Sequence, residues 1–286
     1  MGRDRGLRTL LMRDITLEEL LEAGCHFGHQ VTRQNPKARD YIFEARDNIH
    51  IIDLAKTKEG LDEAAEFVKS LASKENSTLL IVASKKQATQ MVVDEVVRAQ
   101  EAGADGLFYV SNRWIGGILT NLSEVSKNFK KLKDLSEKLV DDNEKSKYTK
   151  REVGEWEKER VKLLSLYGGI SQMGAMPSAI FVVDTHFEDL AVREALRTKV
   201  TTVGITDTNA DPTIIDYPIP ANDDAAGSLR LIITHIMDAW IEGKKAGQAL
   251  QVESAKVEGV EKVEKVEKAP KKAKAVKVVK EKKAKK

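Results

Sequence analysis

Short apolar runs alternate with amphipathic stretches along most of this chain of 286 residues. Each run is apolar on both faces, which suits strands of a parallel sheet that helices cover on both sides. Between the runs, apolar residues recur at helical spacing, as Leu61, Ala65 and Val68 do. The pattern therefore predicts an α/β domain of β-α-β units, with strands near 78–83, 106–110, 179–184, 200–207 and 217–220.

The outer parts of this domain carry their own local signals. Pro218 and Pro220 cannot donate hydrogen bonds to a ladder, so the strand at 217–220 should lie at a sheet edge. The apolar runs 41–44 and 49–53 flank a polar turn and predict a β-hairpin near the amino end.

A different pattern occupies residues 118–167. Apolar residues step by three and four over 122–139 and again over 153–167, on either side of a polar turn at 141–146. Thr149 lies three residues before Glu152, which is the capping-box spacing at the start of a helix. These features predict an antiparallel helical hairpin inserted into the α/β domain.

Charge is distributed unevenly along the chain. The formal net charge is +2, but residues 251–286 contain 13 Lys and 6 Glu, a local balance of +7, which leaves −5 on residues 1–250. With few large apolar residues, the segment 247–286 is predicted to be a disordered Lys-rich tail. Such a tail suits polyanion binding through counterion release, or only solubility. Residues 1–13 are interpreted as an N-terminal extension.

Composition also indicates the cellular compartment of the protein. The single cysteine, Cys25, excludes an internal disulfide and fits a reducing environment. No apolar run approaches the ~20 residues of a membrane-spanning helix, and the Arg-rich start lacks the apolar core of a secretory signal. We expect a cytoplasmic protein without a membrane partner.

Polar residues follow several of the predicted strands. Ser84, Lys85 and Lys86 follow the first, Asp184 follows the third, and 207–211 follows the fourth. This edge of an open α/β sheet is where a nucleotide or metabolite enzyme would bind its ligand. The turn after the first strand contains no glycine, however, and phosphates need close backbone approach. Helix caps and turn formers are therefore the favoured reading, and no cofactor is predicted.

Cys25, His26 and His29 are candidates for metal binding or nucleophilic catalysis. No fourth ligand lies at a matching spacing, and nothing places a base beside the thiol, so neither a metal site nor catalysis is predicted. The alternative is a tight turn with Gly24 and Gly28 that offers donors and planar rings to a partner.

The loop 112–121 is dense in groups that contact phosphate, stack on bases and permit close approach, because it contains Arg113, Trp114, two Gly and two Asn. A structural alternative is a hinge into the hairpin, with Trp114 tucked underneath and Asn121 capping the helix. Near the amino end, a loose basic set is either a second contact region or an ordinary solvated face; it comprises Arg33, Lys37, Arg39 and Arg46.

Many separate motifs of the chain, in order over about 14–241, resemble the small-subunit ribosomal protein two family in its bacterial form. The matching segments include 20–24 with 26–30, 35–37, 41–43, 45–46, 49–52, 56–57, 112–114 with 116–117, 119–121, 168–170, 207–209 with 211–212, and 222–225.

The resemblance implies a three-layer α/β/α, flavodoxin-like body at 14–117 and 168–246 and a coiled-coil hairpin at 118–167, without catalysis. It further implies binding to small-subunit ribosomal RNA between head and body, and docking of the large ribosomal protein one, which captures messenger RNA. A scaffold acting only through protein contacts of the hairpin is the alternative. The candidate RNA-binding residues are His26, Gly28, His29, Gln30, Arg33, Asn35, Lys37, Arg46, Asn48, Asn112, Arg113, Trp114 and Asn121.

Overall fold

A five-stranded parallel sheet is the central element of the computed structural model, which describes residues 13–267. Counted from its first strand, the spatial order is 2-1-3-4-5, which is the flavodoxin-like order. The predicted α/β class is confirmed. The strands, in spatial order, are β5 (Leu107–Val110), β4 (Leu79–Val82), β6 (Ala179–Val182), β7 (Thr201–Thr206) and β8 (Tyr217–Pro220).

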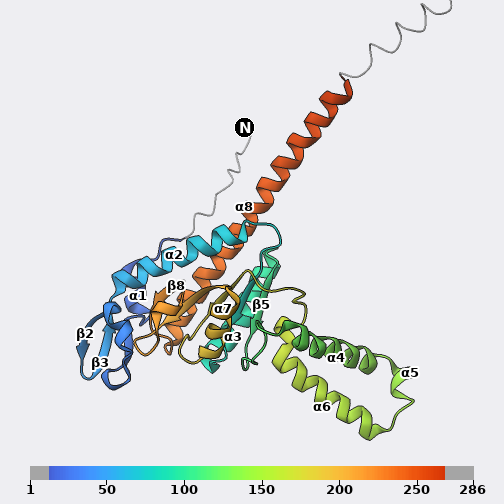
Figure 1. Cartoon of the computed structure of the whole chain (residues 1–286), viewed down its shortest axis with the longest axis horizontal. Coiled ribbons are helices and arrows are strands. Elements are labelled where there is room, and N and C mark those ends of the chain that lie inside the picture. Colours follow the sequence, from blue (N-terminus) through green and yellow to red (C-terminus); the bar gives the residue numbers. More distant parts are fainter. Residues whose placement is uncertain (1–12, 268–286) are drawn as a thin grey trace, which may run out of the picture. The chain divides into compact units, whose positions relative to one another are not determined.

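Helices cover both faces of this sheet (Figure 1). Alternate residues of a strand point to opposite faces, so Leu79 and Ile81 join one buried cluster while Leu80 and Val82 join the other. The first cluster is completed by α2 (Leu54–Ala72), α3 (Lys86–Glu101) and the beginning of α8 (Ala226–Glu267). The second is completed by α7 (Asp189–Thr198) and by the segment that leads into the helical insertion. The result is three layers.

The edge position of β8 agrees with its sequence. This strand pairs only with β7, in register Val203 to Tyr217 and Ile205 to Ile219. Pro218 and Pro220 have no backbone N–H to donate, and at the edge of the sheet this interrupts no hydrogen bonding between central strands.

A second, antiparallel sheet precedes the main one, in the order β1-β3-β2. The predicted hairpin is confirmed: β2 (Ile42–Arg46) and β3 (Ile49–Ile52) are joined at Asp47 and Asn48, whose φ angles are +50° and +61°. Asp and Asn tolerate this left-handed turn. The connecting segments are α1 (Leu17–Glu22) and the 3-10 turns η1 (Val31–Arg33) and η2 (Pro36–Tyr41).

The tight turn predicted around Gly24 and Gly28 is present only at 23–26, where Gly24 has a φ of +78°; its extension to Gly28 and His29 is wrong. Residues Phe27–Gln30 form strand β1, which pairs with β3 through Phe27–Ile51 and Gln30–Ile49. Only one large apolar residue occurs in this strand, so it lacks the alternation that identifies strands in a sequence.

The insertion contains two helices that lie side by side, α4 (Leu122–Val140) and α6 (Lys150–Tyr167), with the short α5 (Asp142–Lys145) between them (Figure 1). They are antiparallel: Phe129 meets Tyr167 at one end, and Lys138 meets Trp156 nearer the turn. The capping box of Thr149 and Glu152 is present, as is that of Thr16 before α1. Coiled-coil packing stays a prediction. The chain returns to the sheet through η3 (Gly168–Ile170).

The chain divides into two compact units after Lys244. Disorder was predicted from residue 247 onward, whereas α8 continues to Glu267. Glu and Val are the most frequent residues of this stretch; its Glu, Lys, Ala and Gln residues have high helix propensity, and Val has a lower one. The predictions for residues 1–12 and 268–286 lie outside the described residues. Across residues 13–267, no helix combines the length and the apolar character of a bilayer crossing.

Candidate nucleic-acid interface

The carboxyl edge of the main sheet is closed by ion pairs. Between β4 and β6 the strand order reverses, and flavodoxin-like folds bind ligands at that point. Here Lys85, after β4, places its Nζ 2.7 Å from Asp184 Oδ2, after β6. The same ammonium lies 2.9 Å from Asp223 Oδ1 and 2.8 Å from Asp224 Oδ1, both in the turn before α8. Three separate loops are thus tied to one cation.

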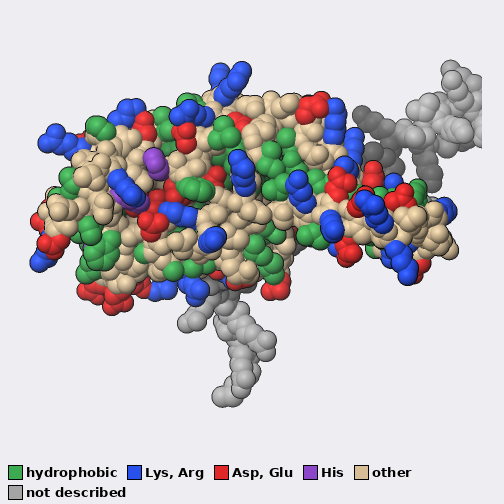
Figure 2. All heavy atoms as spheres, turned by 90° about the horizontal axis from the view of Figure 1, so that it is seen from below, with side chains coloured by type: hydrophobic (Ala, Val, Ile, Leu, Met, Phe, Trp, Pro, Cys, Tyr) green, Lys and Arg blue, Asp and Glu red, His purple; other side chains and the backbone are tan. Residues whose placement is uncertain are grey.

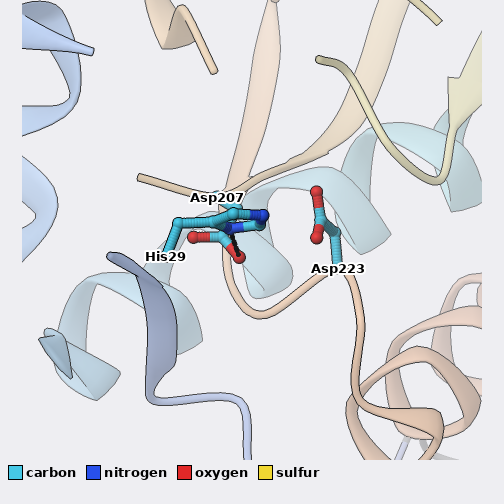
Figure 3. A group of neighbouring side chains, drawn as sticks. All are labelled: His29, Asp207 and Asp223. Atoms are coloured by element: carbon cyan, nitrogen blue, oxygen red, sulfur yellow. Dashed lines mark ion pairs between the residues drawn. The ribbon is translucent and has the colours of Figure 1, made fainter. Parts of the chain in front are cut away.

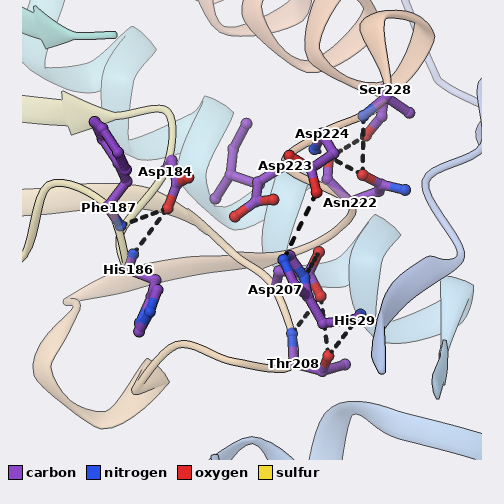
Figure 4. A network of polar contacts seen from close by, with 12 residues as sticks. His29, Asp184, His186, Phe187, Asp207, Thr208, Asn222, Asp223, Asp224 and Ser228 are labelled. Carbon is purple, nitrogen blue, oxygen red and sulfur yellow. Dashed lines mark hydrogen bonds and ion pairs between the residues drawn. The ribbon is translucent and has the colours of Figure 1, made fainter. Parts of the chain in front are cut away.

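Asp184 and Asn222, the residue before Asp223, also shape their own loops (Figure 4). Asp184 accepts hydrogen bonds from the backbone N–H groups of His186 and Phe187, at 3.0 and 2.7 Å. The neighbouring Asn222 accepts from the N–H groups of Asp224 and Ala225. The reading as a turn former is confirmed for Asp184, and Asp211 caps η4 (Pro212–Ile214) by accepting from the Thr213 N–H. Lys85 occupies the N-cap position of α3 without a side-chain capping bond.

His29 joins β1 to this edge from the second sheet. Its backbone N–H donates to Thr208 Oγ1 at 2.9 Å, and its Nδ1 lies 3.0 Å from Asp207 Oδ2. Figure 3 shows His29, Asp207 and Asp223 facing one another. One ligand atom from each lies within 4.8 Å of the others, so these three residues could hold a metal ion. The sequence analysis considered His29 only beside Cys25 and His26, because the two aspartates are distant in the chain.

The crowding of carboxylates shifts their protonation. The pKa of Asp223 is raised to about 7, first by burial and then by the charges of Asp184 and Asp207, although Lys85 opposes them. The pKa of His29 is raised chiefly by its hydrogen bond to Asp207. Burial acts to lower the pKa of Lys85, but its bonds to Asp184 and Asp224 outweigh burial and raise it. One ammonium cannot neutralise every carboxylate around it, so Asp223 binds a proton near neutral pH.

These features do not suit a phosphate ligand. Carboxylates at the strand ends repel phosphate oxygens, and the second sheet covers the adjoining space. Where Ala38, Tyr41 and Ile52 face Thr206 and Thr208, the cavity volume is about 0 Å³. Cys25 is buried, and burial raises the pKa of its thiol, which does not favour the nucleophilic thiolate.

Most of the candidate RNA-binding residues lie on exposed turns and loops. On the second sheet, Arg46 is the last residue of β2 and Asn48 is the second residue of the β2–β3 turn, and both are exposed. The exposed candidates are Gln30, Arg33, Lys37, Arg46, Asn48, Asn112, Arg113 and Asn121.

Other candidates make internal contacts. A Cβ at Gly28 would lie 2.7 Å from Thr208 Cγ2, so this glycine allows β1 to approach the sheet edge. Asn35 caps η2 by accepting from the Lys37 N–H, and Lys37 Nζ lies 2.6 Å from Asp211 Oδ2. The half-buried His26 ring packs on Phe27, with centroids 4.0 Å apart. Each of these residues has a structural role in the protein, and its contact with RNA stays a prediction.

The loop between β5 and α4 divides into exposed and buried parts. Asn112 and Arg113 are exposed, whereas Trp114 retains 5% of its accessible surface. Its indole Nε1 donates to Glu194 of α7 at 3.2 Å. The hinge interpretation of Trp114 is therefore confirmed. Asn121 occupies the N-cap position of α4 without a side-chain capping bond, so its predicted capping role is wrong.

Glu194 was missed by the sequence analysis. It accepts from groups 74–80 residues earlier in the chain, and a single glutamate in a helix gives no local signal of such contacts.

Acidic and basic side chains are mixed on the surface. On the face drawn in Figure 2, Lys and Arg are interspersed with Asp and Glu and do not merge into one basic field. Contact with a polyanion would then depend on individual cations at defined positions.

Comparisons with known proteins cover the body and the insertion alike. The sequence model of the family described as "Ribosomal protein S2" matches residues 20–243. "Small ribosomal subunit protein uS2" of Roseiflexus sp. (strain RS-1) is 45% identical over 241 residues, which is 84% of this chain and 89% of that protein. The protein of the same name from Chloroflexus aurantiacus (strain ATCC 29366 / DSM 635 / J-10-fl) is 43% identical over 241 residues, 84% of this chain and 98% of that protein.

Proposed function

This chain belongs to the Ribosomal protein S2 family, and from that membership we propose that it binds ribosomal RNA between the head and the body of the small subunit and helps to dock the ribosomal protein that captures messenger RNA. Membership itself makes the chain a structural, non-enzymatic constituent of the small ribosomal subunit, among ribosomal RNA and other ribosomal proteins. The resemblance that the sequence motifs indicated is confirmed.

Exposed cations beside amide side chains are the observation that carries the RNA-binding part. Arg46 and Asn48 lie at one turn, and Asn112 and Arg113 are adjacent on another loop. Guanidinium groups bind phosphate through paired hydrogen bonds, and Asn donates to phosphate and sugar oxygens. Folded RNA is recognised largely by shape and 2′-hydroxyls, which suits separate contact points on a surface of mixed charge.

Exposed aromatic side chains support the docking part. On the second sheet, Phe43 of β2 is 72% exposed and Phe27 of β1 is 49% exposed. Aromatic residues at the surface are enriched where proteins bind one another. We propose that this sheet contributes to the surface that a neighbouring ribosomal protein covers.

Sucrose-gradient fractionation of the tagged full chain from cells tests the proposal. The protein should co-migrate with small subunits at low salt and leave them as salt rises, because phosphate contacts release counterions. Recovery at the top of the gradient at every salt concentration would overturn the proposal. Association that resists salt and carries no RNA would favour the scaffold alternative. For the docking part, small subunits from cells depleted of this chain should lack the messenger-capturing protein, and its retention would refute that part.

A further inference from the structure

One buried carboxylate binds almost the whole loop that leads from β5 into the insertion. Glu194 Oε1 accepts from Trp114 Nε1 at 3.2 Å and from the Gly117 N–H at 2.8 Å. Glu194 Oε2 accepts from the N–H groups of Leu119 and Thr120 and from the Thr120 hydroxyl, each at 3.1 Å. Glu194 is 6% exposed, and no Lys, Arg or His forms an ion pair with it among the described residues. Its charge is balanced by five donors of one loop.

Other features of the loop also favour its contact with the Glu194 carboxylate. Gly117 has a φ of +100°, which only glycine adopts readily. This turn directs the N–H groups of Gly117, Leu119 and Thr120 at the two carboxylate oxygens. Ile118 and Leu119 are buried in the same apolar cluster as Val192 and Ala195 of α7. Burial acts to raise the pKa of Glu194, but the hydrogen bonds from the loop outweigh burial and lower it. The carboxylate is therefore ionised at neutral pH and fully used as an acceptor.

The exposed groups of the loop lie immediately outside the bound segment. Arg113 precedes Trp114, and Asn121 follows Thr120. Arg113 has no ion-pair partner within residues 13–267. A shift of the backbone at 114–120 would move Arg113 and Asn121 together with the start of α4.

We propose that Glu194 is a positioning residue, which clamps the loop 114–120 so that Asn112, Arg113 and Asn121 are held in the orientation in which they meet ribosomal RNA. The inference rests on the proposed RNA-binding function. Glu194 itself touches no RNA; it acts through the loop.

Glu194→Gln tests this assignment at nearly constant volume. The amide offers one acceptor oxygen and replaces the other by a donor that faces N–H groups, so at least two bonds are lost. Hydrogen exchange of the peptide 114–121 in the purified full chain should accelerate about tenfold, while exchange in β4 and β6 stays unchanged. Asp189→Asn is the matched control, because it removes an exposed carboxylate from the same helix and leaves the loop contacts intact.

A double-mutant cycle separates positioning from simple stabilisation. Equilibrium binding to small subunits depleted of this protein should weaken about tenfold for Glu194→Gln and about tenfold for Arg113→Ala. If Glu194 acts by placing Arg113, the double variant should bind about as weakly as the weaker single variant. Losses that multiply, or wild-type affinity in Glu194→Gln, would overturn the positioning role.

Two further outcomes have defined meanings. Wild-type protein that fails to bind subunits would refute the proposed function, and the positioning role toward RNA with it, whatever the exchange rates. If Glu194→Gln does not fold, Thr120→Val replaces it, since this variant removes only the hydroxyl donor. It should show a smaller acceleration and a smaller loss of binding, and unchanged values for both would refute the assignment.

Discussion

At the scale of single residues, Lys85 links its own loop to two acidic loops that would otherwise repel each other. Its ammonium contacts Asp184, Asp223 and Asp224. The sequence shows a lysine after one strand and aspartates after others, but it does not show that their loops converge. By contrast, the capping boxes of Thr16 and Thr149 were predictable, because both partners lie within one turn of helix.

The protonation of Asp223 predicts a fall in stability with rising pH. Its folded pKa of about 7 lies above its ordinary value of 3.8, so the folded state holds a proton that is released as pH rises through 7. His29, whose pKa is also raised, acts in the same direction. Between pH 6 and 8 we expect the free energy of unfolding to fall by roughly 1 kcal/mol through Asp223 alone.

Chemical denaturation at several pH values, in EDTA so that no cation contributes, measures this dependence. Asp223→Asn should flatten the slope between pH 6 and 8, because the amide does not titrate and can still accept from Lys85. The exposed Asp94→Asn variant is the control and should keep the wild-type slope. An unchanged slope in Asp223→Asn would show that its carboxyl is ionised throughout this range.

Arg46→Ala and Arg113→Ala test individual phosphate contacts. Each should weaken binding to depleted small subunits about tenfold, as expected for loss of a charge-assisted hydrogen bond. Neither should alter thermal stability, since both side chains are exposed. Arg193→Ala, which removes an exposed arginine paired with Asp189 on α7, serves as the control. Equal subunit occupancy for all three variants would refute the two assignments.

At the scale of elements, short apolar strands and amphipathic helices were predictable, and β1 was not. The edge strand β8 was recognised because its prolines exclude a central position. Strand β1 is held by partners remote in sequence: β3 on one side and, through Gly28 and His29, the Thr208 turn on the other. A strand defined by such contacts has no pattern of its own.

Gly28→Ala should weaken the attachment of the second sheet. The added methyl would lie 2.7 Å from Thr208 Cγ2 and 3.1 Å from the His50 carbonyl oxygen, so strand or turn must move. We expect a loss of about 1–3 kcal/mol in the free energy of unfolding, measured by urea denaturation. Gly154→Ala in α6 meets no atom within 4 Å and should be neutral or stabilising. Equal stability of Gly28→Ala and wild type would contradict the close packing at this site.

At the scale of the whole molecule, the position of the insertion followed from sequence pattern, and the flavodoxin-like strand order followed from the family resemblance. The closure of the ligand-binding edge did not, because it depends on how Lys85, Asp184 and the second sheet meet in space. The distribution of charge along the chain follows from the sequence alone, and it predicts an effect on the rate of association with small subunits.

Removing residues 251–286 should slow association with small subunits. The full chain carries +2, whereas the truncated chain carries −5, and a net negative protein is repelled by RNA at long range. Stopped-flow association rates should differ most at low salt and converge as salt screens the charges. A full-length variant with its 13 tail lysines changed to glutamine falls from +2 to −11 and should associate more slowly than the truncated chain at low salt. Salt-independent rates for all three would exclude a steering role for the tail.

The two ends of the insertion are clasped at one place, where Phe129 and Asn128 of α4 meet Tyr167 of α6. Beyond that contact, α4 and α6 can become longer or shorter by whole helical turns without a change in the residues of the sheet. Relatives should therefore differ in the length of the hairpin near α5, while they keep the contacts between α4 and α6 at its base.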